Sequence, residues 1–466
     1  MKPVYTSVSH LDKKAYETFA MSEEILMEHA ALGMKNAIDT VPGISHVLIV
    51  CGPGNNGADG IALARLLLST YDVTLYLPFG AKSEMAQRQL KRAEALEIKT
   101  VNTLLPCDLV VDALYGSGLN KPLNNEAKNL IQELNKLPAY KVACDIPSGL
   151  FQDGRHEEVF EADLTVSMGA HKLAYFYDGT KDICGRVINV NLGLPYDRYT
   201  DTTDTFLLEP SDMQLPIRQR HFSHKGTYGH VAVLEGAMPG APTMTALAAL
   251  EFGAGLATIV GYEHHDYPYM LMHASHIPTS ANVLALGMGL GGTSYEDQDL
   301  LGMCEGLSLI IDADLFSSPL IMELLQSQEK IVLTPHPKEF ATLLNQLGDK
   351  DVTTDTVLKE KFSLVKAFSR NYPNVVLLLK GTNTLIARNG ITYIASLGTP
   401  ALAKGGSGDI LAGMIAALLA QGYDALDAAV TGTIAHSLAA HNVESANYAL
   451  TPEKLIREIG RLGMEE

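Results

Sequence analysis

The stretch "VLIVCGPGNNGADGIALAR", residues 47–65, decides the fold of the first part of the chain. It opens with an apolar run, passes through a loop that contains Gly52, Gly54 and Gly57, and continues into an Ala- and Leu-rich pattern typical of a helix. A short buried strand, a glycine loop and a helix in this order predict a parallel sheet with helices on both faces.

Working outward, the same alternation of strands and helices fills the chain. Residues 9–40 have helical spacing of apolar residues. The acidic, threonine-rich stretch 196–214 interrupts the alternation and is the best linker candidate. We therefore expect two α/β domains, residues 1–210 and 211–466, the first of them a Rossmann-like three-layer α/β/α domain. The predicted strands are 46–51, 73–77, 108–111, 140–144, 163–167, 230–234, 256–261, 283–286, 307–312, 330–333 and 374–379, and an apolar helix is predicted at 409–420.

Composition narrows the class of protein. The 466 residues have 47% hydrophobic and 19% charged residues, typical of a globular protein. A formal net charge of −18 argues against nucleic-acid and anionic-membrane partners, which need a basic surface. The five cysteines lack a C-x-x-C pair, which indicates reduced thiols and no zinc site. With no signal peptide and no membrane-length apolar run, we expect a cytoplasmic protein. A homo-oligomer is a separate expectation.

The glycine loop satisfies G-x-G-x-x-G, the pattern of redox dinucleotide sites. Such sites also need an acidic residue at the end of the second strand, where it binds the ribose hydroxyls. Here the second strand, "DVTLYLPFG" (72–80), ends without an acid. The sequence therefore argues against a nicotinamide redox cofactor in this domain.

Three strand ends bring oxygen-rich side chains to one edge of the predicted sheet. Asn56 follows the predicted strand 46–51. Asp112 in "DALYGSG" (112–118) follows the strand 108–111, and Ser148 in "DIPSGL" (145–150) follows the strand 140–144. Amide, carboxylate and hydroxyl oxygens suit an alkali or alkaline-earth ion. Each loop alone is also explained by turn chemistry, but three in series favour a ligand site.

These loops resemble the NAD(P)HX epimerase family, the YjeF N-terminal domain, from "ILMEHAA" (25–31) to "ADLTVSMGAHK" (162–172). The resemblance implies that Asn56, Asp112 and Ser148 hold a potassium ion. Ala58 departs from the glycine usual in the family. The contacts implied for the hydrated nucleotide are Asn55, Asn56, Gly57, Ala58, Asp59, Gly116, Ser117, Gly118, Leu119, Asn120, Lys121, Pro122 and Asp145.

Asp145 is our candidate for the group that moves a proton during epimerisation, which opens and recloses the ring at carbon 6. Lys172 is either its polar partner or an ordinary surface lysine. A domain that only binds the nucleotide, without catalysis, is the alternative; the presence of Asn56, Asp112, Asp145 and Ser148 argues against it.

The second domain contains "KGGSGD" (404–409) directly before the apolar helix. Successive backbone N–H groups at a helix start bind anions. A carboxylate beside them, Asp409, suits a base that deprotonates a hydroxyl attacking phosphorus. The alternative is that Asp409 simply caps the helix.

This loop resembles the G-x-G-D element of the ribokinase-like superfamily, so we expect a ribokinase-like α/β/α fold for the second domain. "IDADLF" (311–316), "LTPHPKEFATLL" (333–344) and "LLLKGTNTLI" (377–386) resemble the ADP/ATP-dependent NAD(P)H-hydrate dehydratases. For Asp312 and Asp314, the sequence allows either a functional or a structural role. The resemblance implies substrate contacts at Ala241, Gly289, His336 and Asp409, and adenine-nucleotide contacts at Lys380, Gly381, Thr382, Asn383, Thr384 and Gly408.

Together the two resemblances imply a bifunctional enzyme that repairs hydrated nicotinamide nucleotides. One domain would interconvert (R)- and (S)-NAD(P)HX, and the other would dehydrate (S)-NAD(P)HX to NAD(P)H while ADP becomes AMP and phosphate. The implied cofactors are K⁺ in the first domain and Mg²⁺ with ADP in the second. The rival is a kinase of a small hydroxylated metabolite that uses the same G-x-G-D base.

Overall fold

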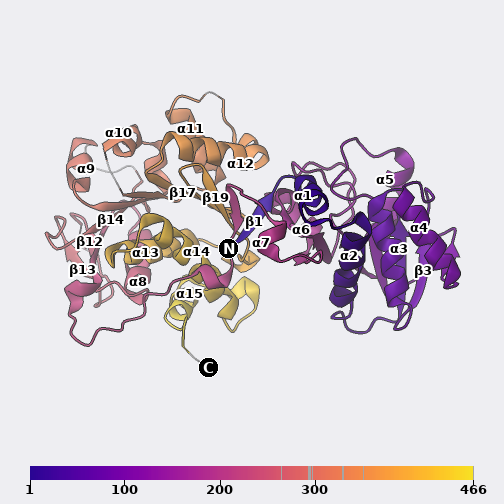
Figure 1. Cartoon of the computed structure of the whole chain (residues 1–466). Coiled ribbons are helices and arrows are strands. Elements are labelled where there is room, and N and C mark those ends of the chain that lie inside the picture. The colour runs from indigo at the N-terminus through magenta and orange to yellow at the C-terminus, as the bar shows by residue number, and fades with distance from the viewer. Residues whose placement is uncertain (264, 292–294, 296, 328–329, 350, 465–466) are drawn as a thin grey trace. The chain divides into compact units, whose positions relative to one another are not determined.

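The computed structural model describes residues 1–263, 265–291, 295, 297–327, 330–349 and 351–464. The chain forms two compact units (Figure 1). The first unit is Pro3–Thr203, and the second unit is Met1–Lys2 with Asp204–Glu466. The change of unit falls inside the acidic stretch 196–214.

The first unit contains a seven-stranded parallel sheet in the order β4-β3-β2-β5-β6-β7-β9. This is the doubly wound order, in which the chain reverses direction across the sheet between β2 and β5. The strands are β2 (His46–Cys51), β3 (Asp72–Tyr76), β4 (Lys99–Val101), β5 (Leu109–Ala113), β6 (Tyr140–Cys144), β7 (Leu164–Met168) and β9 (Arg186–Val190). Outside this sheet, β1 (Lys2–Tyr5) pairs in parallel with β8 (His171–Lys172).

Helices cover both faces of the first sheet, which gives three layers. Figure 1 shows α2, α3 and α4 side by side, and they pack on one apolar cluster with β2 and β5. A second cluster on the opposite face joins α5 to the alternate residues of the same strands, as expected for strands buried on both sides. The helices are α1 (Ser9–Phe19), α2 (Glu23–Ile38), α3 (Asn55–Leu67), α4 (Glu84–Ala95), α5 (Asn125–Lys136), α6 (Lys181–Cys184) and α7 (Tyr196–Tyr199).

Residues 9–40 form two helices and not one continuous segment. Ala20 adopts a left-handed conformation with φ of 52° and ends α1, and the Ser22 side chain accepts a hydrogen bond from the Ile25 N–H and caps α2. The break lets α1 and α2 run in different directions, and both reach the site described below.

The second unit contains a mixed sheet in the order β13-β12-β11-β14-β15-β16-β17-β18-β19-β10. Its strands are parallel from β13 to β17, and β18 is antiparallel to both neighbours. The strands are β10 (Thr205–Leu207), β11 (His230–Leu234), β12 (Leu256–Val260), β13 (Met272–Ala274), β14 (Val283–Leu286), β15 (Ser308–Ile311), β16 (Ile331–Leu333), β17 (Val375–Leu379), β18 (Thr384–Arg388) and β19 (Ile391–Ala395).

A buried helix, α13 (Ser407–Ala420), lies at the centre of the second unit's core. It packs against α8, α14 and the strands β14 and β15. Its small residues permit these close contacts: a Cβ at Gly413 would lie 2.2 Å from the Thr245 carbonyl oxygen of α8. The two units confirm the predicted α/β architecture. The helices are α8 (Gly240–Glu251), α9 (Asp297–Cys304), α10 (Leu320–Ser327), α11 (Pro337–Gln346), α12 (Thr354–Asn371), α13, α14 (Ala425–Asn442) and α15 (Pro452–Ile459).

Candidate functional site

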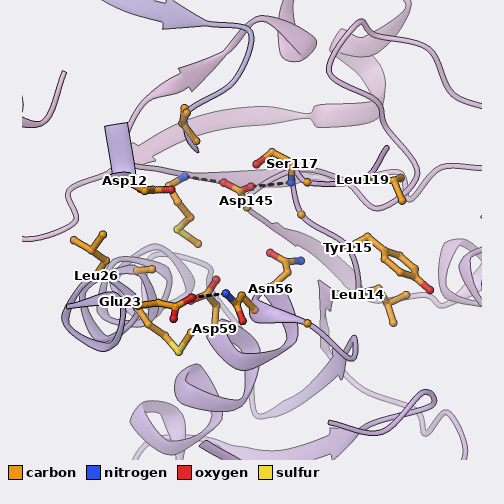
Figure 2. Close-up of a pocket in the computed structure, with 18 of the residues that line it drawn as sticks. Asp12, Glu23, Leu26, Asn56, Asp59, Leu114, Tyr115, Ser117, Leu119 and Asp145 are labelled. Carbon is orange, nitrogen blue, oxygen red and sulfur yellow. Dashed lines mark hydrogen bonds between the residues drawn. The ribbon is translucent and has the colours of Figure 1, made fainter. Parts of the chain in front are cut away.

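A cavity of about 470 Å³ lies in the first unit at the carboxyl ends of its strands (Figure 2). It opens beside the point where the sheet order reverses, between β2 and β5, as expected for a ligand site in a doubly wound sheet. Its wall comes from the loops after β2, β5 and β6 and from α1 and α2. The lining residues are Val8, Asp12, Tyr16, Glu23, Leu26, Met27, Ala30, Pro53, Gly54, Asn55, Asn56, Asp59, Leu114, Tyr115, Gly116, Ser117, Gly118, Leu119, Asn120, Lys121, Asp145, Met168 and Leu192.

The three glycines of the quoted stretch have different roles. A Cβ at Gly52 would lie 1.8 Å from the Leu114 carbonyl oxygen, and one at Gly57 would lie 1.9 Å from the Gly52 carbonyl oxygen. These two glycines therefore let the loop, the start of α3 and the end of β5 pack backbone to backbone. A Cβ at Gly54 would meet no atom within 4 Å, and this residue lines the cavity.

Asp112 and Ser148 form a fully buried pair below the cavity. The Ser148 hydroxyl donates to Asp112 Oδ1 at 2.7 Å, and the Ser148 N–H donates to Oδ2 at 2.8 Å. Burial raises the pKa of Asp112 to about 6, although both hydrogen bonds from Ser148 lower it. No positive side chain appears among the groups that shift this pKa. A bound cation would favour the ionised carboxylate.

Asn56, the third predicted ligand, lies on the cavity wall beside Gly116. A Cβ at Gly116 would be 3.1 Å from Asn56 Oδ1, and the buried Nδ2 has no hydrogen-bond partner in the described part of the chain. An amide that rotates about its last bond can present its oxygen instead. The unpartnered Asn56 amide and the buried, hydrogen-bonded Asp112 carboxylate are oxygen donors of the kind that suits a potassium ion.

Asp145 lies on the loop after β6 with a positive φ of 68°, a conformation that non-glycine residues rarely adopt. Its Oδ1 accepts from Lys172 Nζ at 2.6 Å. Its Oδ2 accepts from the Ser117 N–H at 3.1 Å, a bond drawn in Figure 2. Burial raises the pKa of Asp145, but the Lys172 ammonium and the hydrogen bonds from Ser117 together outweigh burial and hold the pKa below its usual value. Lys172 is 1% exposed, so it is the partner of Asp145 and not a surface residue.

Three further carboxylates belong to this cavity. Asp12 of α1 and Glu23 of α2 line it together with Asp59 of α3. Burial raises the pKa of Asp12, and the Tyr199 hydroxyl, which donates to Asp12 at 2.8 Å, lowers it in part. Sequence reasoning missed Asp12 and Glu23, because an acid on an amphipathic helix looks like an ordinary solvent-facing residue.

Most of the residues expected to contact the nucleotide lie on the cavity wall. Gly57, Ala58 and Pro122 are not part of the lining. Gly57 and Ala58 are buried behind the loop, where they hold the start of α3 against the sheet, and Pro122 is exposed.

In the second unit, "KGGSGD" forms the start of α13 as the sequence predicts. Gly406 is the N-cap residue with a positive φ of 90°, and no side chain caps the helix. Asp409 is the third residue of the helix, so it is not the N-cap residue. Burial raises its pKa, and the nearby Asp312 carboxylate raises it further, while Lys380 lowers it.

Lys380 and Asp312 lie beside this loop. Lys380 Nζ contacts Asp312 Oδ1 at 2.7 Å and approaches Glu339 Oε2 at 3.9 Å. A Cβ at Gly408 would lie 3.4 Å from Lys380 Nζ and 3.7 Å from Asp312 Oδ2. The fold thus brings Lys380, Gly408 and Asp409 together from β17 and α13. The residues that follow Lys380, from 381 to 383, complete the connection from β17 to β18, and Thr384 begins β18.

His336 occupies the N-cap of α11. Its Nδ1 accepts from the Glu339 N–H at 3.2 Å, while the His336 N–H donates to Glu339 Oε2 at 2.7 Å. This capping box fixes a half-exposed imidazole near Lys380, which also approaches Glu339. Ala241 and Gly289 adjoin each other: a Cβ at Gly289 would lie 3.1 Å from the Ala241 Cβ.

Within the described residues, no group of three or more His, Cys, Asp or Glu side chains is arranged to hold a metal ion. None of the described helices is long and apolar enough to span a membrane.

Two family models match the chain. The YjeF-related protein N-terminus matches residues 23–174, and the NAD(P)H-hydrate dehydratase family matches residues 231–461. The bifunctional NAD(P)H-hydrate repair enzyme Nnr of Helicobacter pylori is 41% identical over 99% of this chain and 100% of its own length. The enzyme of the same name from Coxiella burnetii is 32% identical over 93% of each chain.

A solved structure of the ADP/ATP-dependent NAD(P)H-hydrate dehydratase from Bacillus subtilis, co-crystallised with ATP/Mg²⁺, is 25% identical. It covers 52% of this chain and 92% of its own, with a TM-score of 0.45. The full-length relatives and both family models lead to one conclusion. This chain belongs to the family of bifunctional NAD(P)H-hydrate repair enzymes.

Proposed function

We propose that residues 1–210 interconvert the two epimers of NAD(P)HX and that residues 211–466 dehydrate the S epimer with ADP as phosphoryl donor. The observation that supports this most strongly is the position of Asp409. It lies in the first turn of α13, is not the N-cap residue, and shares its surroundings with Lys380.

The dehydration begins as a phosphoryl transfer. Asp409 takes the proton of the ring hydroxyl, the hydroxyl oxygen bonds to the terminal phosphorus of ADP, and the bond to the departing AMP breaks. The loop N–H groups before α13 and the Lys380 ammonium stabilise the charge on the phosphoryl oxygens. Ring nitrogen N1 then expels phosphate from carbon 6, and loss of a proton from carbon 5 restores the dihydronicotinamide.

The proposed Mg²⁺ would be held mainly by the nucleotide phosphates, with Asp312 and Glu339 as the nearby carboxylates, and would neutralise phosphate charge. The turn Lys380–Thr384 would contact the nucleotide, and His336, Ala241 and Gly289 the substrate. ADP as the donor, in place of ATP, is part of the proposal. A homo-oligomeric state and a cytoplasmic location are also part of the proposal. The free cysteine thiols favour the cytoplasmic location.

In the first unit, the hydrated nucleotide would occupy the cavity. Asn56, Asp112 and Ser148 would hold K⁺, which would neutralise the buried carboxylate and fix the loops that form the wall. Asp145, kept ionised by Lys172, is in place to accept the proton of the ring hydroxyl when the ring opens.

Two variants of the whole chain test the proposal, and each serves as the control for the other. Asp409→Asn should lower dehydration about 10²–10⁴-fold, the usual contribution of a general base, and leave epimerisation intact. Asp145→Asn should do the reverse. Epimer composition is followed by chromatography, and dehydration by free phosphate and dihydronicotinamide absorbance. A stable phosphorylated product without free phosphate would favour the small-metabolite kinase and contradict the proposal.

A further inference from the structure

Two carboxyl groups on the cavity wall of the first unit differ in their hydrogen-bond and ion-pair partners. Asp145, at the end of β6, accepts from a lysine and from backbone N–H groups. Asp59, in α3, points into the same cavity from the other side (Figure 2). Among the residues that the structure describes, Asp59 has no hydrogen-bond donor and no ion-pair partner, although every other acid on the cavity wall has one.

The electrostatic environment of Asp59 is negative. Burial raises the pKa of Asp59 well above its usual value, and repulsion from Asp145, Asp12 and Glu23 adds to the effect. Lys172 forms its ion pair with Asp145, and Lys121 lies exposed on the cavity wall. The titratable groups that couple to Asp59 are Asp145 of the β6 loop, Cys144 of β6, Asp12 and Tyr16 of α1, and Glu23 of α2.

The proposed epimerisation needs both an acid and a base. Carbon 6 carries a hydroxyl and a bond to N1. When the ring opens, the hydroxyl loses its proton, the carbon–oxygen double bond forms, and the C6–N1 electron pair moves to N1, which must gain a proton. Rotation about the C5–C6 bond and reclosure on the other face return both protons. Neighbouring groups whose pKa values are pushed apart suit these two tasks.

We infer that Asp59 is the general acid of the epimerase site: it protonates N1 as the ring opens and recovers this proton on closure, while Asp145 serves the hydroxyl from the opposite wall. This inference rests on the proposed epimerase function of the first unit. It goes beyond substrate binding, because it assigns to Asp59 a proton that is transferred in each turnover.

The other two acids are engaged elsewhere. The Tyr199 hydroxyl donates a hydrogen bond to Asp12 at 2.8 Å, and the Asn55 side chain donates one to Glu23. These hydrogen bonds engage the carboxyl groups of Asp12 and Glu23 with neighbouring side chains. Among the described residues, Asp59 is therefore the carboxyl group of the wall that has no protein partner and faces the cavity.

The test is Asp59→Asn in the full chain, assayed with purified (R)-NADPHX in the presence of K⁺ and without ADP. We expect kcat for epimerisation to fall about 10²–10⁴-fold with little change in KM. The fall of the wild-type rate on the alkaline side of its pH profile should also disappear. An unchanged kcat, or a raised KM with the wild-type kcat, would overturn the inference and leave Asp59 as a binding residue at most.

Folding of the variant is checked inside the same molecule. Asparagine is close to isosteric with a protonated aspartic acid, so the thermal unfolding curve and the dehydratase rate of the second unit should match the wild type. An independent readout is the infrared carbonyl band of a protonated carboxylic acid at neutral pH, which should be present in the wild type and weaker in Asp59→Asn. Identical spectra would contradict the inference whatever the rates.

Failure of the underlying function gives a different result. A wild-type chain that does not epimerise NADPHX at all rejects the proposed epimerase activity itself. A wild-type chain that epimerises, with an Asp59→Asn variant equally active, rejects only the role of Asp59.

Discussion

Replacement of Gly57 by alanine tests whether this glycine serves packing or ligand binding. In α3, an alanine Cβ at this position would lie 1.9 Å from the Gly52 carbonyl oxygen and 2.8 Å from its nitrogen. Both atoms belong to the main chain, and the Gly52 N–H is itself bonded to the Ala113 carbonyl at 2.9 Å. No side chain can rotate away, so the loop or the helix must move.

The size of the effect follows from two opposing contributions. Overpacking of a well-packed site costs about 1–3 kcal/mol, and a shift of the backbone places this change at the upper end. Alanine gains about 1 kcal/mol over glycine within a helix. We therefore expect a net loss of about 2 kcal/mol in the unfolding free energy of the first unit. The matched control is Gly54→Ser, because a Cβ there meets no atom within 4 Å and serine is favoured at an N-cap; its effect should stay within about 0.5 kcal/mol.

Urea unfolding of both variants, followed by circular dichroism, measures these changes. Hydrogen exchange of peptides from residues 47–65 assigns the affected transition to the first unit, because two units need not unfold together. A Gly57→Ala chain as stable as the wild type, or more stable, would refute the packing explanation of this glycine.

Three further predictions concern buried charges. Lys172→Met leaves Asp145 without its cationic partner, so the unfolding free energy of the first unit should fall by about 3–5 kcal/mol. Epimerisation should be lost while dehydration is retained. An unchanged urea midpoint would contradict this prediction. Asp112→Asn removes the proposed potassium carboxylate, so its epimerisation rate should no longer respond to KCl at constant ionic strength; a wild-type response would exclude Asp112 as a ligand. Burial lowers the pKa of His436 to about 4, against 6.5 in the unfolded chain, so the unfolded state binds the proton first as the pH falls. As the pH falls from 6.5 to 4, the second unit of the wild type should lose about 3 kcal/mol of unfolding free energy, and the His436→Gln variant should not show this loss. If the unfolding free energies of wild type and variant depend equally on pH, His436 is not the group responsible.

Much of the framework of both units could be predicted from short apolar runs. Strands β2, β6, β11 and β14 occupy the predicted ranges, and the loops after β2, β5 and β6 meet at one sheet edge, because parallel strands share their carboxyl ends. The hairpin of β18 and β19 was missed, although Asn389–Gly390, with φ of 49° and 79°, is a typical hairpin signal.

The remaining features depend on tertiary contacts that no local pattern encodes. Asp12 and Glu23 reach the cavity only because Ala20 breaks the N-terminal helical segment into α1 and α2. The burial of Lys172 follows from the pairing of β8 with β1, two short strands far apart in the sequence. The pairing of Lys380 with Asp312 likewise requires two strand ends to meet.

The most direct test of the central claim uses an equal mixture of (R)- and (S)-NADPHX with the intact chain, Mg²⁺, K⁺ and ADP. Return of the dihydronicotinamide absorbance is followed against the rate of spontaneous epimer exchange. The account predicts complete recovery, faster than spontaneous exchange allows, with one phosphate released per NADPH. No recovery with either ADP or ATP would contradict it, and recovery that stalls when the S epimer is consumed would remove the epimerase activity.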